Sequence, residues 1–328
     1  MPELPEVETI ARGLANRVTG DVIESVWLGQ KKEPLKSPAS EIASTLEHSQ
    51  IAAVRRMGKH IVFDLDRVAR APSPAKSVGW TLPSTSSGQA LSAKGMKPKP
   101  ARARAGIRPS QTSSEIHAEA NEGVRPTPGN AQWIVHLGMT GRLQVCEPQD
   151  EVLKHTHAIL RLASGRELRF VDPRRFGRLS VARAGGFDTG GVEPLEVELD
   201  RFTVLFRGRK TPIKSALLNQ KLLRGVGNIY ADESLFRAGI RPRRHAASIT
   251  HQQLGKLFVA VKEVLREAIA LGGSSVSDYV DADGEEGFFQ LQHRVYGREG
   301  EPCLVCKSPI KRVVIAGRSS HYCPKCQK

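Results

Sequence analysis

The chain has 328 residues, a formal net charge of +15 and a pI of about 9.9. This length suits two domains with substantial cores, and the excess of basic residues indicates a polyanionic partner such as nucleic acid. No apolar run approaches the roughly 20 residues of a membrane span, and the acidic N-terminus does not resemble a signal peptide. We therefore expect a cytoplasmic protein with no membrane contact.

The opening segment, MPELPEVETI, allows two interpretations. If Met1 is removed, Pro2 presents a secondary amine whose pKa, near the ~7.7–8.0 of an α-amino group, lies far below the ~10.4 of a lysine. Such an amine is nucleophilic near neutral pH and forms an iminium with a carbonyl-like carbon, with Glu3 beside it as a proton donor. Alternatively, Pro2 and Pro5 merely open a helix. This stretch alone leaves both interpretations open.

The first half of the chain is predicted to be rich in strands. A helix is expected over residues 3–14, where apolar residues recur on one face, and strand patterns follow at 22–28, 51–57, 60–66, 132–145, 157–165 and 166–172. The pattern stops over residues 67–131, which hold 8 of the 20 prolines and ten Lys or Arg against three Glu. This composition predicts a disordered basic insertion, which a surface hairpin can carry at a small cost in loop closure.

Beyond residue 197 the patterns become helical. Short helices are expected over 212–220 and 229–238, and a long one over 250–271. Thr250 and Gln253 match a capping box at the start of the long helix, and Gly272 ends it. The sequence thus predicts a β-rich domain over 1–197 with the insertion at 67–131, a helical domain over 198–298, and a separate tail over 299–328.

The tail contains four of the five cysteines, and the fifth, Cys146, stands alone. Two Cys-x-x-Cys pairs, CLVC and CPKC, are 16 residues apart, which is the spacing of a four-thiolate zinc site. A tail this short cannot bury a core, so the metal would supply its folding energy. We expect one structural Zn²⁺, bound by Cys303, Cys306, Cys323 and Cys326.

Several motifs together resemble a known family. They are PELPEVE at the start, HLGMTG (136–141), DPRRFG (172–177), RGVGNIYADESLFRAGIRP (224–242) and the final GRSSHYCPKCQK. In this order they resemble the formamidopyrimidine-DNA glycosylases over the whole chain except residues 67–131, and the leucine in PELPE favours this branch over the endonuclease VIII branch. The resemblance implies an α+β fold, with an N-terminal β-sandwich and flanking helix, a C-terminal helix-two-turn-helix domain and a four-cysteine zinc-finger β-hairpin.

The resemblance also implies an activity and the residues that carry it. The expected enzyme is a bifunctional DNA glycosylase/AP lyase of base excision repair, which excises 8-oxoguanine and formamidopyrimidines and cuts the strand by β,δ-elimination. Pro2 would attack C1′ of the damaged nucleotide, Glu3 would transfer protons, Lys59 at a hairpin turn would contact phosphate and the lesion, and Arg318 would grip the phosphate beside it.

Further DNA contacts follow from the same motifs. Three residues match those that fill the void left by the extruded base: Met139, Arg174 and Phe176. Four match positions that bind the DNA backbone, namely His157, Arg175, Lys210 and Asn228, and Lys214 is a candidate for one more phosphate contact. The glycine-rich, acidic stretch at 274–290 is expected to form a lid over the base.

The expected partner is damaged double-stranded DNA, bound by a monomer at the nucleoid without a small-molecule cofactor. Three alternatives remain from the sequence. The first is an enzyme of the same fold that prefers oxidised pyrimidines or abasic sites. The second is a catalytically silent DNA-binding protein, which would not need the set Pro2, Glu3, Lys59 and Arg318. The third is a proline-amine enzyme for small carbonyl substrates, which would leave the zinc hairpin and the basic surface unexplained.

Overall fold

The computed structural model describes residues 1–31, 33–68, 130–275 and 287–328. Most of the predicted insertion and the centre of the predicted lid, residues 276–286, lie outside the described residues. The described part is a mixed α+β fold, as the sequence predicts. Within these ranges, no helix has the length and apolar composition needed to cross a membrane.

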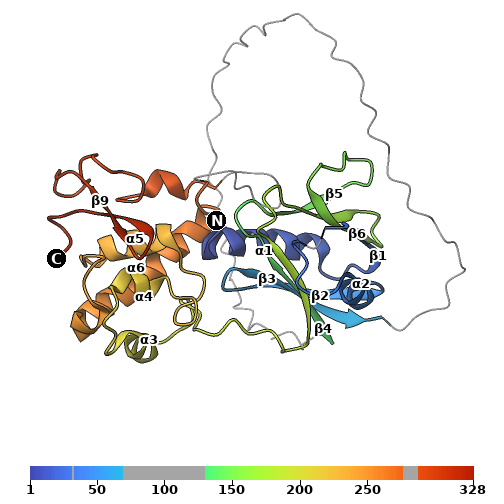
Figure 1. Ribbon diagram of the computed structural model, residues 1–328, viewed down its shortest axis with the longest axis horizontal. Coiled ribbons are helices and arrows are strands. Elements are labelled where there is room, and N and C mark those ends of the chain that lie inside the picture. Colours follow the sequence, from blue (N-terminus) through green and yellow to red (C-terminus); the bar gives the residue numbers. More distant parts are fainter. Residues whose placement is uncertain (32, 69–129, 276–286) are drawn as a thin grey trace, which may run out of the picture. The chain divides into compact units, whose positions relative to one another are not determined.

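Two four-stranded antiparallel sheets form the N-terminal half, accompanied by helices α1 (Leu4–Val18) and α2 (Ala39–Leu46) (Figure 1). One sheet has the order β1-β6-β7-β5, and the other has the order β2-β3-β4-β8. Alternate residues of both sheets meet the apolar faces of α1 and α2 in one core, as expected for packed sheets that each bury one face. The strands are β1 (Ile23–Leu28), β2 (Ser49–Met57), β3 (His60–Arg67), β4 (Ala131–His136), β5 (Arg142–Cys146), β6 (Thr156–Leu162), β7 (Glu167–Val171) and β8 (Arg178–Arg183).

Strands β3 and β4 are direct neighbours although more than sixty residues separate them in the sequence. They pair antiparallel, from His60 opposite His136 to Leu65 opposite Ala131. The predicted insertion therefore lies in the connection between two adjacent strands of one sheet. At the other end of β3, Gly58 and Lys59 form the tight turn from β2, so the prediction that Lys59 lies at a hairpin turn is confirmed.

Helix α1 contributes to two hydrophobic cores. Its residues Val7, Ile10 and Leu14 lie in the core of the sheets, whereas Leu4 lies in the core of the C-terminal helices. The amide of Leu4 also donates to the carbonyl oxygen of Gly225, at 3.0 Å. The segment that carries Pro2 and Glu3 is thereby anchored where the two cores meet.

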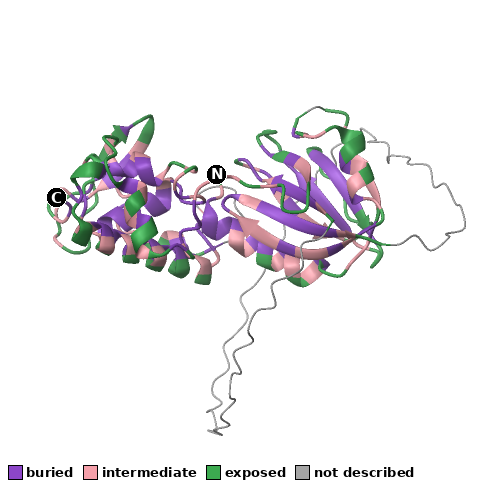
Figure 2. Cartoon of the chain, turned by 90° about the horizontal axis from the view of Figure 1, so that it is seen from below, coloured by how far each residue is buried: buried purple, intermediate pink, exposed green. Residues whose placement is uncertain are grey.

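The C-terminal half is helical and ends in a hairpin. The long helix α6 begins after Thr250, whose side chain accepts from the amide of Gln253 at 3.2 Å in the predicted capping box. Figure 2 shows buried positions concentrated where these helices pack together. The elements are α3 (Leu199–Phe206), α4 (Ile213–Leu217), α5 (Asn228–Arg237), η1 (Ala246–Ser248), α6 (His251–Ala270), η2 (Phe289–Gln292), and the hairpin of β9 (Lys311–Ile315) and β10 (Arg318–Tyr322).

Asp172 connects two loops at one end of the sheets. It is fully buried, and its carboxylate accepts from the hydroxyl of Thr140 at 2.6 Å and from the amides of Arg174 at 3.2 Å and Gly177 at 2.7 Å. Thr140 belongs to the β4–β5 loop, and the other two belong to the β7–β8 loop. A single buried acceptor therefore fixes the HLGMTG loop against the DPRRFG loop.

Replacing Asp172 with alanine should destabilise the fold. The change leaves buried donors without an acceptor, so we expect the free energy of unfolding to fall by about 2–4 kcal/mol. Urea unfolding followed by circular dichroism measures this. The control is Asp150→Ala, which removes an exposed carboxylate that accepts from the amide of Glu147 and should change the free energy by less than about 0.5 kcal/mol. Equal effects of the two changes would contradict this role of Asp172.

Candidate active site

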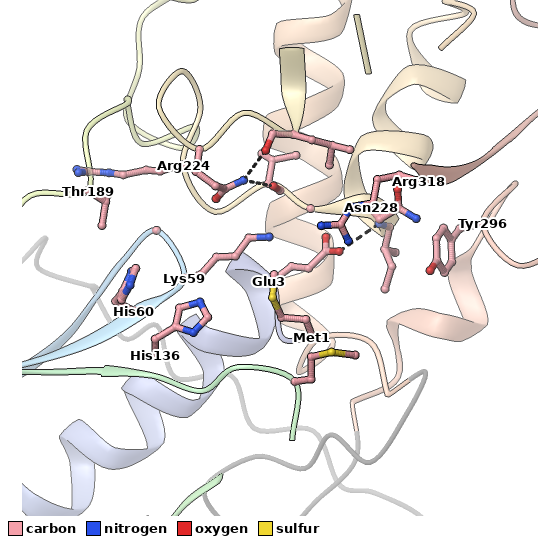
Figure 3. Close-up of a pocket in the computed structure, with 17 residues that line it drawn as sticks. Met1, Glu3, Lys59, His60, His136, Thr189, Arg224, Asn228, Tyr296 and Arg318 are labelled. Atoms are coloured by element: carbon pink, nitrogen blue, oxygen red, sulfur yellow. Dashed lines mark hydrogen bonds between the residues drawn. The ribbon is translucent and has the colours of Figure 1, made fainter. Parts of the chain in front are cut away.

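A cavity of about 500 Å³ gathers residues that are far apart in the sequence (Figure 3). Met1 and Glu3 come from the N-terminus, Lys59 from the β2–β3 turn, Asn228 from the start of α5, and Arg318 from the zinc-finger hairpin. Half-buried Pro2 lies between the first two. Of the four residues predicted to act in catalysis, the structure therefore places three in the lining of one cavity and the fourth in the chain between two lining residues.

The carboxylate of Glu3 is held against the N-terminus of α5. Its Oε1 accepts from the amide of Ile229 at 3.3 Å, and the positive end of the helix dipole favours a negative charge there. The close approach requires glycine at the helix cap, because a Cβ atom at Gly227 would overlap the Glu3 side chain. Gly225 has a φ of +89° and faces Leu4 in the same way. The glycines of the GVGN segment thus make room for the N-terminal segment.

Glu3 and Lys59 are buried together, and their pKa values shift toward each other. Burial raises the pKa of Glu3, and the positive charge of Lys59 offsets part of that rise. Burial likewise lowers the pKa of Lys59; the charges of Glu3 and Glu6 oppose this, and that of Arg318 adds to it. Both groups can therefore exchange protons more readily near neutral pH than exposed Glu and Lys residues.

A second buried carboxylate, that of Glu6, ties the N-terminus to the segment leading into the predicted lid. It accepts from the amide of Glu3 at 2.7 Å and from the amide of Ser274 at 2.8 Å, and the hydroxyl of Tyr230 donates to it as well. Burial raises the pKa of Glu6. Its hydrogen bonds join the backbone of Glu3 to α5 and to Ser274.

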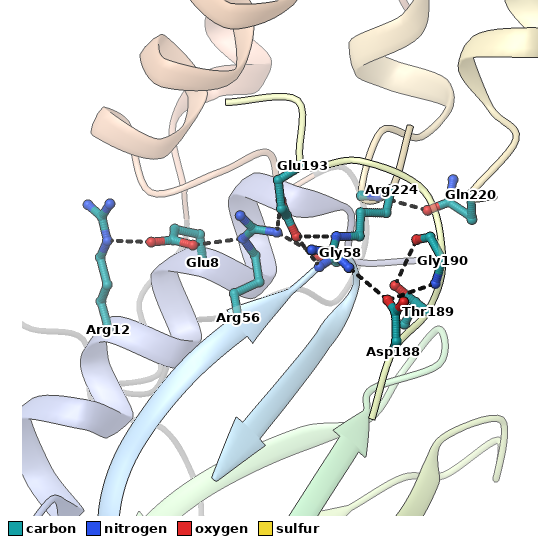
Figure 4. A network of polar contacts seen from close by, with 11 residues as sticks. Glu8, Arg12, Arg56, Gly58, Asp188, Thr189, Gly190, Glu193, Gln220 and Arg224 are labelled. Atoms are coloured by element: carbon teal, nitrogen blue, oxygen red, sulfur yellow. Dashed lines mark hydrogen bonds and ion pairs between the residues drawn. The ribbon is translucent and has the colours of Figure 1, made fainter. Parts of the chain in front are cut away.

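The turn that presents Lys59 is held by a charged network (Figure 4). Glu193, in the connection after β8, accepts from the amide of Gly58 at 2.8 Å and from the guanidinium of Arg56 at 2.8 Å. The guanidinium of Arg224, just before the glycines of the GVGN segment, lies 2.9 Å from Glu193. The network joins the Lys59 turn to the segment that makes room for Glu3, so both sides of the cavity are positioned together.

A buried ion pair supports the hairpin that carries Arg318. Lys214 on α4 lies 2.7 Å from the carboxylate of Asp232 on α5, and its ammonium donates to the carbonyl oxygen of Ser319 at 2.6 Å. Asp232 also accepts from the amide of His321 at 2.9 Å. The prediction that Lys214 adds a surface phosphate contact is wrong, because its side chain is fully buried beneath the hairpin. Exposed Arg318 follows the two-residue turn of Ala316 and Gly317.

The four predicted metal ligands converge. Their sulfur atoms all lie within 4.8 Å of one another, with 3.9 Å between Cys303 and Cys326 and 3.3 Å between Cys306 and Cys323. Tetrahedral thiolates at the usual Zn–S distance of ~2.3 Å are about 3.8 Å apart, so the cluster fits one Zn²⁺. Gln327 fixes the tail next to it by donating to the carbonyl oxygen of Ile240 at 2.8 Å.

The predicted void-filling residues lie at the tips of the two loops that Asp172 joins. The side chains of Met139 and Phe176 are 42% and 53% exposed, although both are large and apolar. The guanidinium of Arg174 lies over the ring of Phe176, 4.9 Å from its centroid. Gly138, with a φ of +67°, lets the backbones of the two loops touch. The loops therefore present a paired apolar and aromatic edge to solvent.

The four residues predicted to bind the DNA backbone are not all exposed. Arg175, with a φ of +57°, and Lys210 are exposed, and Asn228 is half-buried with its amide 3.5 Å from the hydroxyl of Ser319. His157 is buried, and its Nε2–H donates to the carbonyl oxygen of Asp172 at 3.0 Å. Asn228 lines the cavity, whereas the other three do not.

Sequence reasoning missed several lining residues. His136 opens the HLGMTG motif, so a signal for it was present. Tyr296 stands in a segment that no motif singled out, and His60 directly follows Lys59. Tyr296 is held through Glu233, which accepts from its amide at 2.8 Å. The rings of His60 and His136 are 4.8 Å apart.

Arg318, Lys59 and Glu3 line one cavity, and Met139 of the exposed edge lines it as well. The two cations at this cavity suit a polyanionic substrate. Three family descriptions match the chain: the N-terminal domain of formamidopyrimidine-DNA glycosylase over residues 1–179, its H2TH domain over 191–280, and a zinc finger found in FPG and IleRS over 300–328. The chain therefore belongs to the formamidopyrimidine-DNA glycosylase family.

Individual relatives agree with this assignment. The chain is 36% identical to a formamidopyrimidine-DNA glycosylase of Gluconobacter oxydans over the whole of both chains. It is 51% identical to that of Solibacter usitatus over 208 residues, which cover 61% of this chain and 75% of the relative. Among solved structures it resembles the MutM (Fpg) protein of Thermus thermophilus, with a TM-score of 0.73 and 35% identity over 99% of this chain and 98% of the other. It also resembles Lactococcus lactis Fpg in complex with DNA containing an abasic site, with a TM-score of 0.74 and 25% identity over 99% of both chains.

Gly227→Ala should displace the carboxylate of Glu3 and leave the rest of the fold intact. Because a misplacement of about 1 Å at a reacting group can cost roughly 100-fold in rate, we expect single-turnover base excision to fall by about that factor. Gly255→Ala on α6 is the matched control, because a Cβ there meets open space. Excision at the wild-type rate by Gly227→Ala would contradict the packing argument.

Proposed function

We propose that this chain, a DNA glycosylase for oxidised purines in base excision repair, uses the amine of Pro2 as its nucleophile after removal of Met1. The amine attacks C1′ of the damaged nucleotide, the bond from C1′ to the base breaks, and the base leaves with a proton. The bond from C1′ to the ring oxygen O4′ then breaks as O4′ takes a proton, which leaves an iminium between C1′ and the proline nitrogen. The iminium acidifies the protons at C2′, so that β- and then δ-elimination release the two flanking phosphates and cut the strand. The observation that carries this proposal is the convergence of Glu3, Lys59 and Arg318 around one cavity beside Pro2.

Glu3 is the acid of the proposed reaction. A carboxyl group whose pKa is raised by burial keeps its proton closer to neutral pH, so it can protonate the ring oxygen of the sugar as C1′ is attacked. Lys59 and Arg318 supply positive charge on either side of the reacting sugar. The arginine fork at the hairpin turn suits a phosphate in two parallel hydrogen bonds.

The exposed edge formed by Met139, Arg174 and Phe176 would fill the duplex when the damaged base leaves the stack. Unstacking costs a few kcal/mol, and an apolar wedge backed by a planar cation offsets part of that cost. The proposed contacts to the DNA backbone are Arg175, Lys210, Asn228 and His157. The ring of His157 is oriented by its hydrogen bond to the carbonyl oxygen of Asp172.

The rival functions differ in what they require of this site. A protein that only binds DNA would not need a buried Glu–Lys pair, because charges buried without a task cost stability. An enzyme for small carbonyl compounds would not need the zinc hairpin or the exposed wedge. An enzyme with the same catalytic residues that prefers oxidised pyrimidines would differ from this proposal only in the lesions it excises. Assays of base excision from duplexes with one defined lesion distinguish the two.

The proposed cellular location follows from the DNA substrate. We place the enzyme in the cytoplasm at the nucleoid, as a monomer that needs no small-molecule cofactor. The Zn²⁺ held by the four cysteines is structural, because the thiolates occupy all four positions of a tetrahedral ion.

Borohydride trapping tests the nucleophile. Wild-type protein with Met1 removed should form a covalent complex with a duplex that carries 8-oxoguanine opposite cytosine. Pro2→Gly should lower base excision on the order of 1,000-fold, as expected when one member of a catalytic set is lost, while DNA binding persists. Protein that retains Met1 should behave similarly, because its proline nitrogen is an amide. Excision at the wild-type rate by protein with a blocked N-terminus would move the nucleophile elsewhere, with Lys59 the first candidate.

Two substitutions separate the metal from the phosphate grip. Cys323→Ser should release Zn²⁺ and lower both lesion binding and activity, because the hairpin loses its support. Arg318→Ala should retain one equivalent of Zn²⁺ and still bind lesion-containing DNA more weakly, by about tenfold or more for a lost charged hydrogen bond. Zinc analysis by atomic absorption and anisotropy titrations measure the two effects. An unchanged zinc content in Cys323→Ser would disprove the assigned ligand set.

A further inference from the structure

Three side chains form a row across neighbouring strands at the rim of the cavity. His60 on β3 is the Cα partner of His136 on β4, and His136 is the partner of Arg178 on β8. Directly opposite residues of antiparallel strands project from the same face, with Cβ atoms about 5 Å apart. Both histidines line the cavity that also holds Glu3 and Lys59. Exposed Arg178 instead lines an adjoining groove together with Arg175.

We infer that His60, His136 and Arg178 form one phosphate-binding row, and that His60 takes up a proton from solvent when a DNA phosphate docks on it. This inference rests on the proposed function, because it assumes that the damaged strand enters the cavity. It extends the DNA-binding surface across β3, β4 and β8 and adds a proton to the binding equilibrium.

The surroundings of the two imidazoles keep them neutral in the free protein. Burial lowers the pKa of His60 to about 4; a hydrogen bond with the backbone of Met57 opposes this, and Arg178 adds to it. Burial also lowers the pKa of His136 to about 4, with further lowering by His60, Arg178 and Lys59. The uncharged ring of Phe187 also packs against His60, with 5.0 Å between the ring centroids. Among the described residues, the charges that shift the pKa values of the two rings are cationic, so an arriving phosphate would offset them.

The hydrogen bonds assign different roles to the two rings. Nδ1 of His136 accepts from the amide of Gly138 at 3.1 Å. In its neutral form His136 therefore carries its proton on Nε2 and can donate it to a phosphate. A second proton on Nδ1 would break the bond to Gly138, which disfavours charging this ring. The hydrogen bond of His60 with the backbone of Met57 instead favours the charged ring, so His60 is the ring that becomes charged.

The direction of the pH effect follows from linkage. Because the pKa of His60 is higher in the complex than in the free protein, the complex binds more protons, and DNA affinity increases as the pH falls. The gain begins as the pH falls through the pKa in the complex and ends near pH 4, where the free protein is also protonated. Between those limits the affinity can change by up to about tenfold per pH unit for one proton.

The experiment measures DNA affinity by fluorescence anisotropy from pH 5.5 to 8.0 at constant ionic strength. A duplex with a tetrahydrofuran abasic analogue serves as the probe, because it binds without reacting. For wild type we expect tighter binding on acidification. His60→Phe and His60→Gln should both reduce the slope of log Kd against pH, by up to one unit where wild type takes up one proton. Glu3, Lys59 and His136 still titrate in these variants, so the difference in slope reports His60. His251→Gln, at an exposed position on α6, should match wild type.

Two further measurements complete the test. Arg178→Gln should reduce the slope of log affinity against log salt by about 0.9, the value for one lost phosphate contact. Calorimetry at pH 6 in two buffers with different ionisation enthalpies should detect proton uptake in wild type and less in His60→Gln. Equal pH slopes in wild type and both His60 variants would overturn the inference. A slope that is lost in His60→Phe but kept in His60→Gln would also overturn it, because the effect would then come from altered side-chain packing and not from a proton. If wild type is trapped covalently on DNA but takes up no proton, this inference alone is contradicted. If wild type takes up a proton but is not trapped, the proposed function is contradicted.

Discussion

The constraint on which the site depends is the burial of the Glu3 carboxylate between two hydrophobic cores. A carboxylate removed from water is costly unless it is paired and hydrogen-bonded. Here the start of α5 supplies an amide and a helix dipole, and Lys59 supplies the counter-charge. The approach is possible only because Gly227 has no Cβ atom. The GVGN glycines, the tight β2–β3 turn and the position of Leu4 in the second core can all be understood as conditions for placing this one group.

The rest of the cavity is built by the same means, with buried acidic groups that organise backbone amides. Glu6 fixes the N-terminus and Ser274, Glu193 fixes the Lys59 turn, Glu233 fixes the segment of Tyr296, and Asp232 fixes the zinc-finger hairpin. Each acidic residue accepts from main-chain donors, so the geometry it holds is that of the backbone. Rigid placement of the loops around the cavity reduces the entropy lost when substrate binds. The zinc cluster does the same for the outer hairpin.

The sequence predicted the elements whose signals are local. The capping box of Thr250, the spacing of the four cysteines and the strand patterns around the insertion all reappear in the fold. It did not predict α2 or α3, eight-residue helices without a capping side chain, or β8, which follows directly after the DPRRFG loop. Among site residues, motif matching found Glu3, Lys59 and Arg318. It misjudged Lys214, because a lysine gives the same signal in sequence whether it faces solvent or a buried carboxylate. Tyr296 reaches the cavity only through tertiary contacts. His60 follows Lys59 in the chain, but its place in the cavity depends on strand pairing with β4.

The electrostatic design of the free site is unbalanced in a way that suits its substrate. Lys59 and Arg318 line the cavity, Arg178 lies beside it, and burial weakens the charged form of Lys59. These cations act on their neighbours: the charge of Arg318 adds to the lowering of the Lys59 pKa, and that of Arg178 adds to the lowering of the His60 and His136 pKa values. A bound phosphate offsets these positive charges. The same imbalance in the free protein therefore favours a phosphate backbone over a neutral ligand, and the cavity selects first for DNA and only then, through its shape, for the damaged nucleotide.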